Sequence, residues 1–313
     1  MNPVIAQECD IDMPVGMHVF ERGWLSANNI LFMDRGDAAL VDSGDLTQSQ
    51  QTVALVEQRL AGQPLRRLVN THLHSDHCGG NAALQRRWQP RTWIPVGDAA
   101  AVSAWDEDAL SFTATGQQCE PFRYDHVLRD GEILRLATID WQILAAPGHD
   151  AHAVMLYAPQ ERILISGDAL WENGFGVIFP ELDGESGFAE QHAVLERIAG
   201  LDVRLVVPGH GRPFTNIDSA LELAVSRIGY LRADPARNAT NALKALLAFR
   251  VLEQQYTTRD ALLAWMTQTP LIQQISIQYL CGQAPAEILD TAISTLKAAR
   301  ALKLDGNWIR PCE

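Results

Sequence analysis

Three histidines and one aspartate fall within six positions of the chain, as His72, His74, Asp76 and His77. They follow an apolar stretch over residues 65–69, which predicts a strand that ends at this run. Because side chains alternate along an extended chain, His72 and His74 would point to the same side, and the turn that follows can bring Asp76 and His77 back toward them. Imidazole and carboxylate groups are metal ligands, so this segment predicts a metal site.

Three further potential ligands lie downstream, each beside a glycine and at the end of a predicted strand. They are His149, Asp168 and His210, which follow apolar stretches at residues 141–146, 162–165 and 203–207. Ligands placed where a strand meets a loop are held by a rigid scaffold and stay open to substrate, as a catalytic metal requires. Each group alone is typical of an ordinary turn or cap, and it is the joint pattern that indicates a metal centre.

The order H-x-H-x-D-H, then a histidine, an aspartate and a final histidine, resembles the pattern of the metallo-β-lactamase superfamily. The resemblance covers residues 15 to about 218 and includes an early turn at residues 39–44. It implies an α/β fold, the four-layer αβ/βα sandwich, in which two mixed sheets pack face to face between helices and the metal cleft lies along one edge of the sheets. We therefore expect residues 1–218 to form a catalytic domain with the metallo-β-lactamase fold.

The resemblance also implies two divalent metal ions and gives each potential ligand a place. The first ion would be held by His72, His74 and His149, the second by Asp76, His77 and His210, and both ions by Asp168. Five imidazoles and two carboxylates suit Zn²⁺, with iron or manganese as alternatives.

Two adjacent metal ions predict hydrolysis, since a water bridging them would become a hydroxide near neutral pH and attack a carbonyl or phosphoryl centre. Asp76 is the candidate catalytic residue, because a carboxylate beside the nucleophile could orient it and carry a proton to the leaving group. The alternative is that Asp76 serves only as a ligand. Asp42, in an early turn, is a candidate partner for the outer N–H of a metal-bound imidazole.

Asp168 separates the branches of the superfamily. Its β-lactam hydrolases lack the bridging carboxylate, whereas thioesterases, lactonases, phosphodiesterases and tRNA-processing nucleases have it. The resemblance therefore favours hydrolysis of an ester, thioester or lactone, which makes a small molecule the expected substrate. The alternatives are a phosphodiesterase or ribonuclease with the same metal centre, an iron-dependent dioxygenase, and a non-catalytic ligand sensor or effector on the same fold.

The segment after Asp168, residues 169–179, is rich in aromatic residues and glycines. Trp171 and Phe175 are the candidate substrate-binding residues, because they leave a metal-bearing strand end and could form an apolar pocket for an acyl or aryl group. Trp24, in a loop expected to overhang the cleft, is a further candidate. Packing of the loop onto the sandwich is the alternative role for each of them.

Other histidines and the cysteines are not expected to be ligands. His152 follows His149 by three positions, where relatives tend to have a second histidine four positions on. His18, His126 and His192 have no predicted partner at the site. Cys78 is expected to pack beneath the site as a small buried residue.

Bulk composition places the chain among ordinary globular proteins. With 313 residues, 47% of them hydrophobic and 20% charged, it is long enough for one large core and an appendage. No apolar stretch is long enough to cross a membrane, and residues 1–16 lack the features of a signal peptide. The cysteines are scattered and lack C-x-x-C spacing, which predicts free thiols in a reducing compartment, here the cytoplasm. They are Cys9, Cys78, Cys119, Cys281 and Cys312.

Charge is unevenly distributed along the chain, whose formal net charge is −13. Residues 1–218 contain 15 Lys and Arg against 30 Asp and Glu, whereas residues 219–313 contain 10 against 8. A nucleic-acid-binding protein needs a clustered cationic surface. The acidic balance argues against a nucleic-acid partner without excluding it.

Residues 219–313 have the pattern of a separate unit. Helical spacing of apolar residues predicts helices at 219–232, 243–251, 259–266 and from 285, followed by a hairpin around Asp305 and Gly306. This order predicts a small, mainly helical, winged-helix-like C-terminal module. We expect it to act as a lid or a homodimer surface, with nucleic-acid contact as the alternative.

Overall fold

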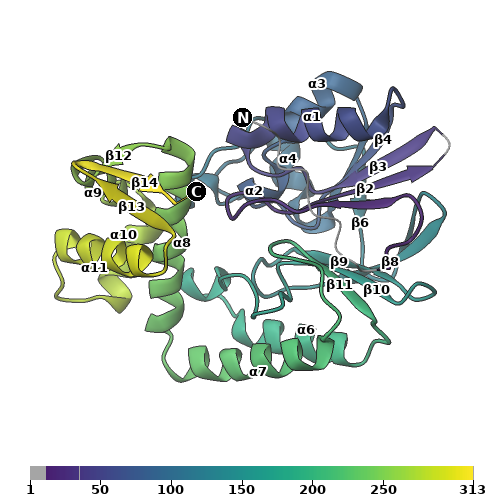
Figure 1. Cartoon of the computed structure of the whole chain (residues 1–313). Helices are drawn as coiled ribbons and strands as arrows, with labels where there is room; N and C mark the ends of the chain where they lie inside the picture. The colour runs from purple at the N-terminus through teal and green to yellow at the C-terminus, as the bar shows by residue number, and fades with distance from the viewer. Residues whose placement is uncertain (1–11, 35, 313) are drawn as a thin grey trace.

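The structure, a computed structural model, describes residues 12–34 and 36–312 of the chain. Two mixed β-sheets with flanking helices form the larger part, and further helices with a small third sheet form the rest (Figure 1). Cys9 lies outside the described residues. Among the described helices, none has the length and apolar character needed to span a membrane.

The first sheet has six strands, antiparallel at its start and parallel from the third strand onward. In sheet order they are β1 (Met17–Phe20), β2 (Asn29–Asp34), β3 (Asp37–Val41), β4 (Leu65–Val69), β5 (Arg91–Pro95) and β6 (His126–Leu128). Parallel neighbours need a crossover connection. The crossovers contain α1 (Ser49–Leu60), α2 (Ser75–Cys78), α3 (Asn81–Trp88), α4 (Ala99–Ala104) and α5 (Phe112–Thr115).

The second sheet has five strands in the order β11-β10-β9-β8-β7, and only β10 and β11 are parallel neighbours. The strands are β7 (Ile133–Leu136), β8 (Ile139–Ala145), β9 (Val154–Ala158), β10 (Ile163–Gly167) and β11 (Leu205–Pro208). The crossover between β10 and β11 contains α6 (Phe188–Ala199).

Alternation of side chains along β3 explains how the layers form. Val41 points into the core between the two sheets, where Trp141 of β8 is fully buried. Its neighbour Leu40 points to the other side and packs with Val56 of α1 and Leu84 of α3. Successive residues of a strand face opposite sides, so one strand supplies both cores.

The outer face of the second sheet is covered by α6 and α7 (Ile217–Ala233), which share a core with it that includes Leu144, Leu195 and Ile228. The layers therefore run helix, sheet, sheet, helix, with α1 and α3 above and α6 and α7 below in Figure 1. The predicted αβ/βα sandwich is confirmed.

The C-terminal region is mainly helical, as predicted. It contains α8 (Ala236–Gln254), β12 (Thr257–Thr258), α9 (Arg259–Met266), α10 (Pro270–Tyr279), α11 (Pro285–Ala298), β13 (Leu302–Asp305) and β14 (Trp308–Pro311). The apolar stripe of α11, including Leu289 and Leu296, packs with Leu246 of α8 in a hydrophobic core that also includes Leu182, from the segment between β10 and β11. The helix α7 instead contributes Leu221 and Ile228 to the sandwich core. A domain division at residue 218 and the winged-helix character stay predictions.

Candidate metal centre

The run that begins at His72 lies directly after β4, and its last residues form the short helix α2. Glycines let this helix pack closely on the loop that follows β3. A Cβ added at Gly80 would lie 2.4 Å from the carbonyl oxygen of Ser43, and one at Gly79 would lie 2.4 Å from the backbone nitrogen of Leu46. The two glycines that end the motif thus allow a close backbone approach that holds α2 in place.

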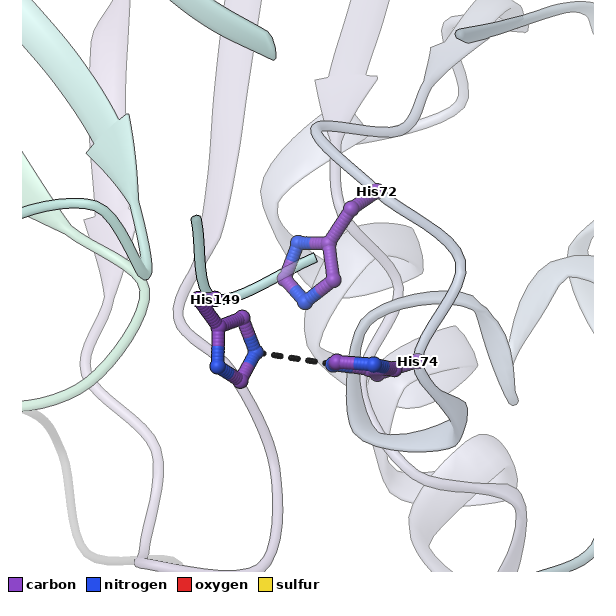
Figure 2. A group of neighbouring side chains, drawn as sticks. All are labelled: His72, His74 and His149. Atoms are coloured by element: carbon purple, nitrogen blue, oxygen red, sulfur yellow. Dashed lines mark hydrogen bonds between the residues drawn. The ribbon is translucent and has the colours of Figure 1, made fainter. Parts of the chain in front are cut away.

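One group of potential ligands consists of His72, His74 and His149, whose rings lie close together although His149 comes from the loop after β8 (Figure 2). Nδ1 of His74 lies 2.8 Å from Nε2 of His149. The other ring nitrogen of His149 donates to the carbonyl oxygen of Val177 at 2.5 Å. Nε2 of His72 is buried and has no hydrogen-bond partner among the described residues, which is costly unless a cation satisfies it.

A second group consists of Asp76, His77 and His210. Oδ2 of Asp76 lies 2.9 Å from Nε2 of His210 and 3.9 Å from Nε2 of His77. His77 is completely buried, and His210 is almost so because it follows β11 at the edge of the sheet. This group therefore joins α2 of the first half of the sandwich to a strand end of the second half.

Asp168, at the end of β10, lies between the two groups. Its Oδ1 is 3.3 Å from Nε2 of His77, and its Oδ2 is 3.5 Å from Nε2 of His149. Gly209 makes room for this carboxylate, because a Cβ at position 209 would lie 2.2 Å from Oδ1 of Asp168. The two oxygens of one carboxylate thus face different histidine groups.

Burial and neighbouring charges shift the pKa values of the potential ligands. Burial lowers the pKa of His72 well below its usual value, and burial with the neighbouring His74 lowers the pKa of His149 to about 4. Burial opposes ionisation of His77 and Asp168 too, but charge attraction prevails: Asp168 and Asp42 raise the pKa of His77, and His210 and then His77 lower the pKa of Asp168. Neutral imidazoles such as those of His72 and His149, and ionised carboxylates such as that of Asp168, are the forms that bind metals, so an ion at His77 would replace its proton.

Asp42 is the partner of His77, as expected for a carboxylate behind a ligand. It is fully buried, its Oδ2 accepts a hydrogen bond from Nδ1 of His77 at 2.8 Å, and its two oxygens accept from the backbone nitrogen and hydroxyl of Thr71. Its φ of 57° lies in the left-handed region, which aspartate tolerates better than most residues. This contact leaves Nε2 of His77 facing Asp168.

Two supporting residues were missed from the sequence. Thr71 precedes the histidine run, and both its backbone nitrogen and its hydroxyl donate hydrogen bonds to the carboxylate of Asp42. Asn28 donates from Nδ2 to the carbonyl oxygens of Pro208 and Gly211, at 3.0 and 2.7 Å, and so fixes the loop that carries His210. Threonine and asparagine are common in loops, so nothing in their spacing singled them out.

The histidines that were not expected to be ligands have other partners. Nδ1 of His152 lies 2.7 Å from Asp98, and His126 stacks on Trp93 with ring centroids 4.5 Å apart. Cys78 is buried, with its Sγ 3.8 Å from that of Cys119. The four described cysteines are free thiols. All seven predicted ligands meet at one place, whereas these residues do not join them.

A pocket of about 280 Å³ opens beside the seven residues. Trp171 and Phe175 line it, and the indole nitrogen of Trp171 donates to Oδ1 of Asp168 at 3.2 Å. Trp24 also lines it and stacks on Phe249 of α8, with ring centroids 5.0 Å apart.

Part of the pocket wall comes from helices that the sequence motifs did not place. Arg227 of α7, with Asn241 and Lys244 of α8, lines the side contributed by these helices. Residues of α11, among them Leu296, complete this side. The C-terminal region therefore shapes the space in front of the potential ligands.

An αβ/βα sandwich with histidine and aspartate ligands at the strand ends defines a class of metal-binding proteins. The sequence model of the metallo-beta-lactamase superfamily matches residues 22–210. The chain belongs to this superfamily.

Curated relatives are similar over the same part. Hydroxyacylglutathione hydrolase of Chromohalobacter salexigens is 32% identical over 197 residues, which are 61% of this chain and 65% of the relative. A probable metallo-hydrolase of Bacillus subtilis is 24% identical over 274 residues, covering 72% of this chain and 80% of its own length. The chain spans slightly less than two thirds of the first curated relatives that it matches.

Solved structures share the fold over nearly the whole chain. A metallo-beta-lactamase family protein from Thermus thermophilus superposes with a TM-score of 0.56 at 20% identity, covering 95% of this chain and 98% of its own. A beta-lactamase domain protein from Burkholderia ambifaria gives a TM-score of 0.52 at 22% identity, covering 96% and 93%. The fold similarity thus extends over the C-terminal helices.

Proposed function

We propose that this chain is a hydrolase with two divalent metal ions that cleaves an ester, thioester or lactone, with a thioester as the first choice. The observation that carries the proposal is the convergence of seven buried or nearly buried histidines and aspartates beside a pocket. Relatives named hydroxyacylglutathione hydrolase support the choice of a thioester, because an acyl group on the sulfur of glutathione is one.

The ligand sets follow the groups in the structure. His72, His74 and His149 would hold one ion, and Asp76, His77 and His210 the other. Asp168 would contact both, which is supported by its two oxygens facing His77 and His149. The donor chemistry fits Zn²⁺, with iron or manganese as alternatives. When bound, such ions supply Lewis acidity for a substrate oxygen and lower the pKa of water.

Asp76 is the residue we assign to proton transfer. It lines the pocket, and its Oδ2 lies 2.9 Å from Nε2 of His210. In this role its carboxylate orients the attacking water and passes a proton to the leaving group. The oxygen of water bonds to the acyl carbon, the carbon–sulfur bond breaks, and the products are an acid and a thiol. Trp171 and Phe175 would hold the apolar part of the substrate.

The phosphodiesterase or ribonuclease function is retained as the second candidate, because two cationic side chains, Arg227 and Lys244, line the same pocket. The strongly acidic balance of residues 1–218 speaks against a long nucleic acid. Cytoplasmic location, a homodimer and the lid role of the C-terminal region stay predictions.

Metal analysis followed by a substrate panel tests the proposal. Protein purified without added metal is measured by plasma mass spectrometry, then assayed with thioester, lactone, phosphodiester and β-lactam substrates. We expect about two metal equivalents and preferential thioester turnover. Preferential turnover of phosphodiesters would favour the second candidate.

Single variants test the ligand sets. His77→Ala and Asp168→Ala are each expected to lose about one metal equivalent and most activity. His192→Ala is the matched control, since His192 lies on α6 and its ring faces Glu196 at 3.7 Å, away from the centre. Full metal content in either ligand variant would show that the assignment is wrong.

A further inference from the structure

The pocket has two chemically different sides. The sandwich contributes carboxylates and imidazoles, among them Asp76 and His149. The opposite side, formed by α7 and α8, contributes Arg227 and Lys244. Figure 1 shows α8 between the sandwich and the remaining C-terminal helices. Both cations lie beyond residues 22–210, the part that matches the superfamily model.

Arg227 is held in place by packing. Its guanidinium lies over the ring of Phe175, 4.9 Å from the ring centroid. It also lies against Gly174, where an added Cβ would be 2.5 Å from Nη1 and where φ is +123°. A side chain at position 174 would therefore displace the guanidinium. Because residue 174 is a glycine, Arg227 can occupy this half-buried position in the pocket.

No acidic group in the described part of the chain neutralises this arginine. Among the residues that the structure describes, Arg227 has no carboxylate or hydrogen-bond partner, and burial alone lowers its pKa. Other arginines of the chain do have such partners: Arg67 pairs with Asp37 at 2.6 Å, and Arg259 pairs with Asp290 at 2.6 Å. A largely buried charge without a partner is unfavourable. The pocket thus keeps an unsatisfied cation beside its apolar wall.

Lys244 adds a second charge of the same sign. Its pKa is lowered by partial burial and by the nearby Arg227, and no acid in the described part of the chain offsets this. Asn241, on the preceding turn of α8, adds a side-chain amide to the same wall. Two cations that repel each other, with an amide beside them, are the groups that bind a carboxylate or a phosphate.

We propose that Arg227 and Lys244 form a subsite for an anionic group at one end of the substrate, a carboxylate or a phosphate, while the bond to be cleaved lies at the histidine and aspartate side. This inference rests on the proposed hydrolase function and narrows its substrate to an acidic ester or thioester. The pocket volume of about 280 Å³ favours a small acidic group over a large one.

Binding of non-hydrolysable analogues tests the subsite without relying on turnover. The probes are three thioethers of similar length in which a methylene replaces the thioester carbonyl: S-ethyl-3-mercaptopropionate with a carboxylate, S-ethyl-2-mercaptoethyl phosphate with a phosphate, and neutral S-ethyl-N-acetylcysteamine. Calorimetric titration of the metal-loaded protein should show an anionic probe binding at least about tenfold tighter than the neutral one. Whichever anionic probe binds with the higher affinity shows whether the subsite takes a carboxylate or a phosphate.

Variants assign the effect to the two cations. Arg227→Gln and Lys244→Gln should each weaken the anionic probe by about 10- to 100-fold and leave the neutral probe unchanged. Arg227→Lys keeps a charge and should recover part of the loss. Arg232→Gln, an exposed change on the same helix, is the control. Circular dichroism verifies that each variant is folded.

The corresponding acetyl thioesters provide the kinetic readout. We expect Arg227→Gln to raise KM for the acidic thioester at least about tenfold more than KM for the neutral one. Equal binding of charged and neutral probes, or unchanged affinity in both glutamine variants, would overturn the subsite. If no ester, thioester or lactone were hydrolysed but the anionic probe still required Arg227, the hydrolase proposal would fail and the subsite would stand.

Discussion

The substitution Asp42→Asn tests how the structure prepares His77 for metal binding. The backbone nitrogen of Thr71 donates to Oδ1 of Asp42 at 2.9 Å, so the amide oxygen of the introduced asparagine would have to take that place. The amide nitrogen would then replace Oδ2, which accepts from Nδ1 of His77 at 2.8 Å. Two donors cannot share a hydrogen bond, and the ring proton of His77 would therefore move to Nε2.

That tautomer change removes a ligand, because Nε2 of His77 is the nitrogen that faces Asp168 at 3.3 Å. Loss of such a supporting contact typically lowers metal affinity by about 10- to 100-fold, which corresponds to about 1.4 to 2.7 kcal/mol. Asparagine tolerates the left-handed φ of 57° at this position, so the backbone should be unaffected. The change therefore isolates the hydrogen bond.

The assay is a competition titration of Zn²⁺ against a chromophoric chelator, with metal content measured in parallel. Asp125→Asn is the matched control, since Oδ2 of Asp125 accepts a backbone hydrogen bond from Thr92 at 2.8 Å, outside the metal centre. A Zn²⁺ affinity of the Asp42 variant within about twofold of the control would refute the tautomer argument.

Three further changes have definite expected outcomes. Gly209→Ala places a Cβ 2.2 Å from Oδ1 of Asp168, so plasma mass spectrometry should find less bound metal although circular dichroism shows a folded protein. Phe175→Ala empties a fully buried site and should lower the free energy of unfolding by about 3 kcal/mol or more in urea titrations, unless the wall collapses into the space. Burial and then Asp45 raise the pKa of Glu253 from 4.5 to about 7. The folded state thus binds the proton more tightly, and stability present below pH 4.5 is lost as the pH rises through 7, by about 3 kcal/mol in all. Glu253→Gln should flatten this dependence between about pH 5 and 8, and parallel curves for the two proteins would contradict the reasoning.

The sequence could predict which side chains converge because three histidines and an aspartate occur within six positions. The strand was expected to end at this run, whereas β4 ends at Val69, so the loop that follows it sets the spacing of His72 and His74. The layers could be expected from the resemblance, and the alternation of Leu40 and Val41 explains why β3 contributes to two cores.

The pocket wall could not be predicted in the same way. Arg227 and Lys244 reach the pocket only because α7, which covers the second sheet, continues into α8 beside the sandwich, and a lone sequence does not specify how two helices are oriented against a distant sheet. Thr71 and Asn28 act through single hydrogen bonds between segments far apart in the chain. Such contacts depend on tertiary structure and leave no periodic signal.

The C-terminal helices bear on which substrates related chains could accept. The predicted ligands lie in the sandwich, whereas Asn241, Lys244 and Leu296 of the pocket wall come from α8 and α11. Substitutions along α8 can therefore change which compounds bind while the seven predicted ligands stay in place. Related chains with the same seven ligands can then have different substrates.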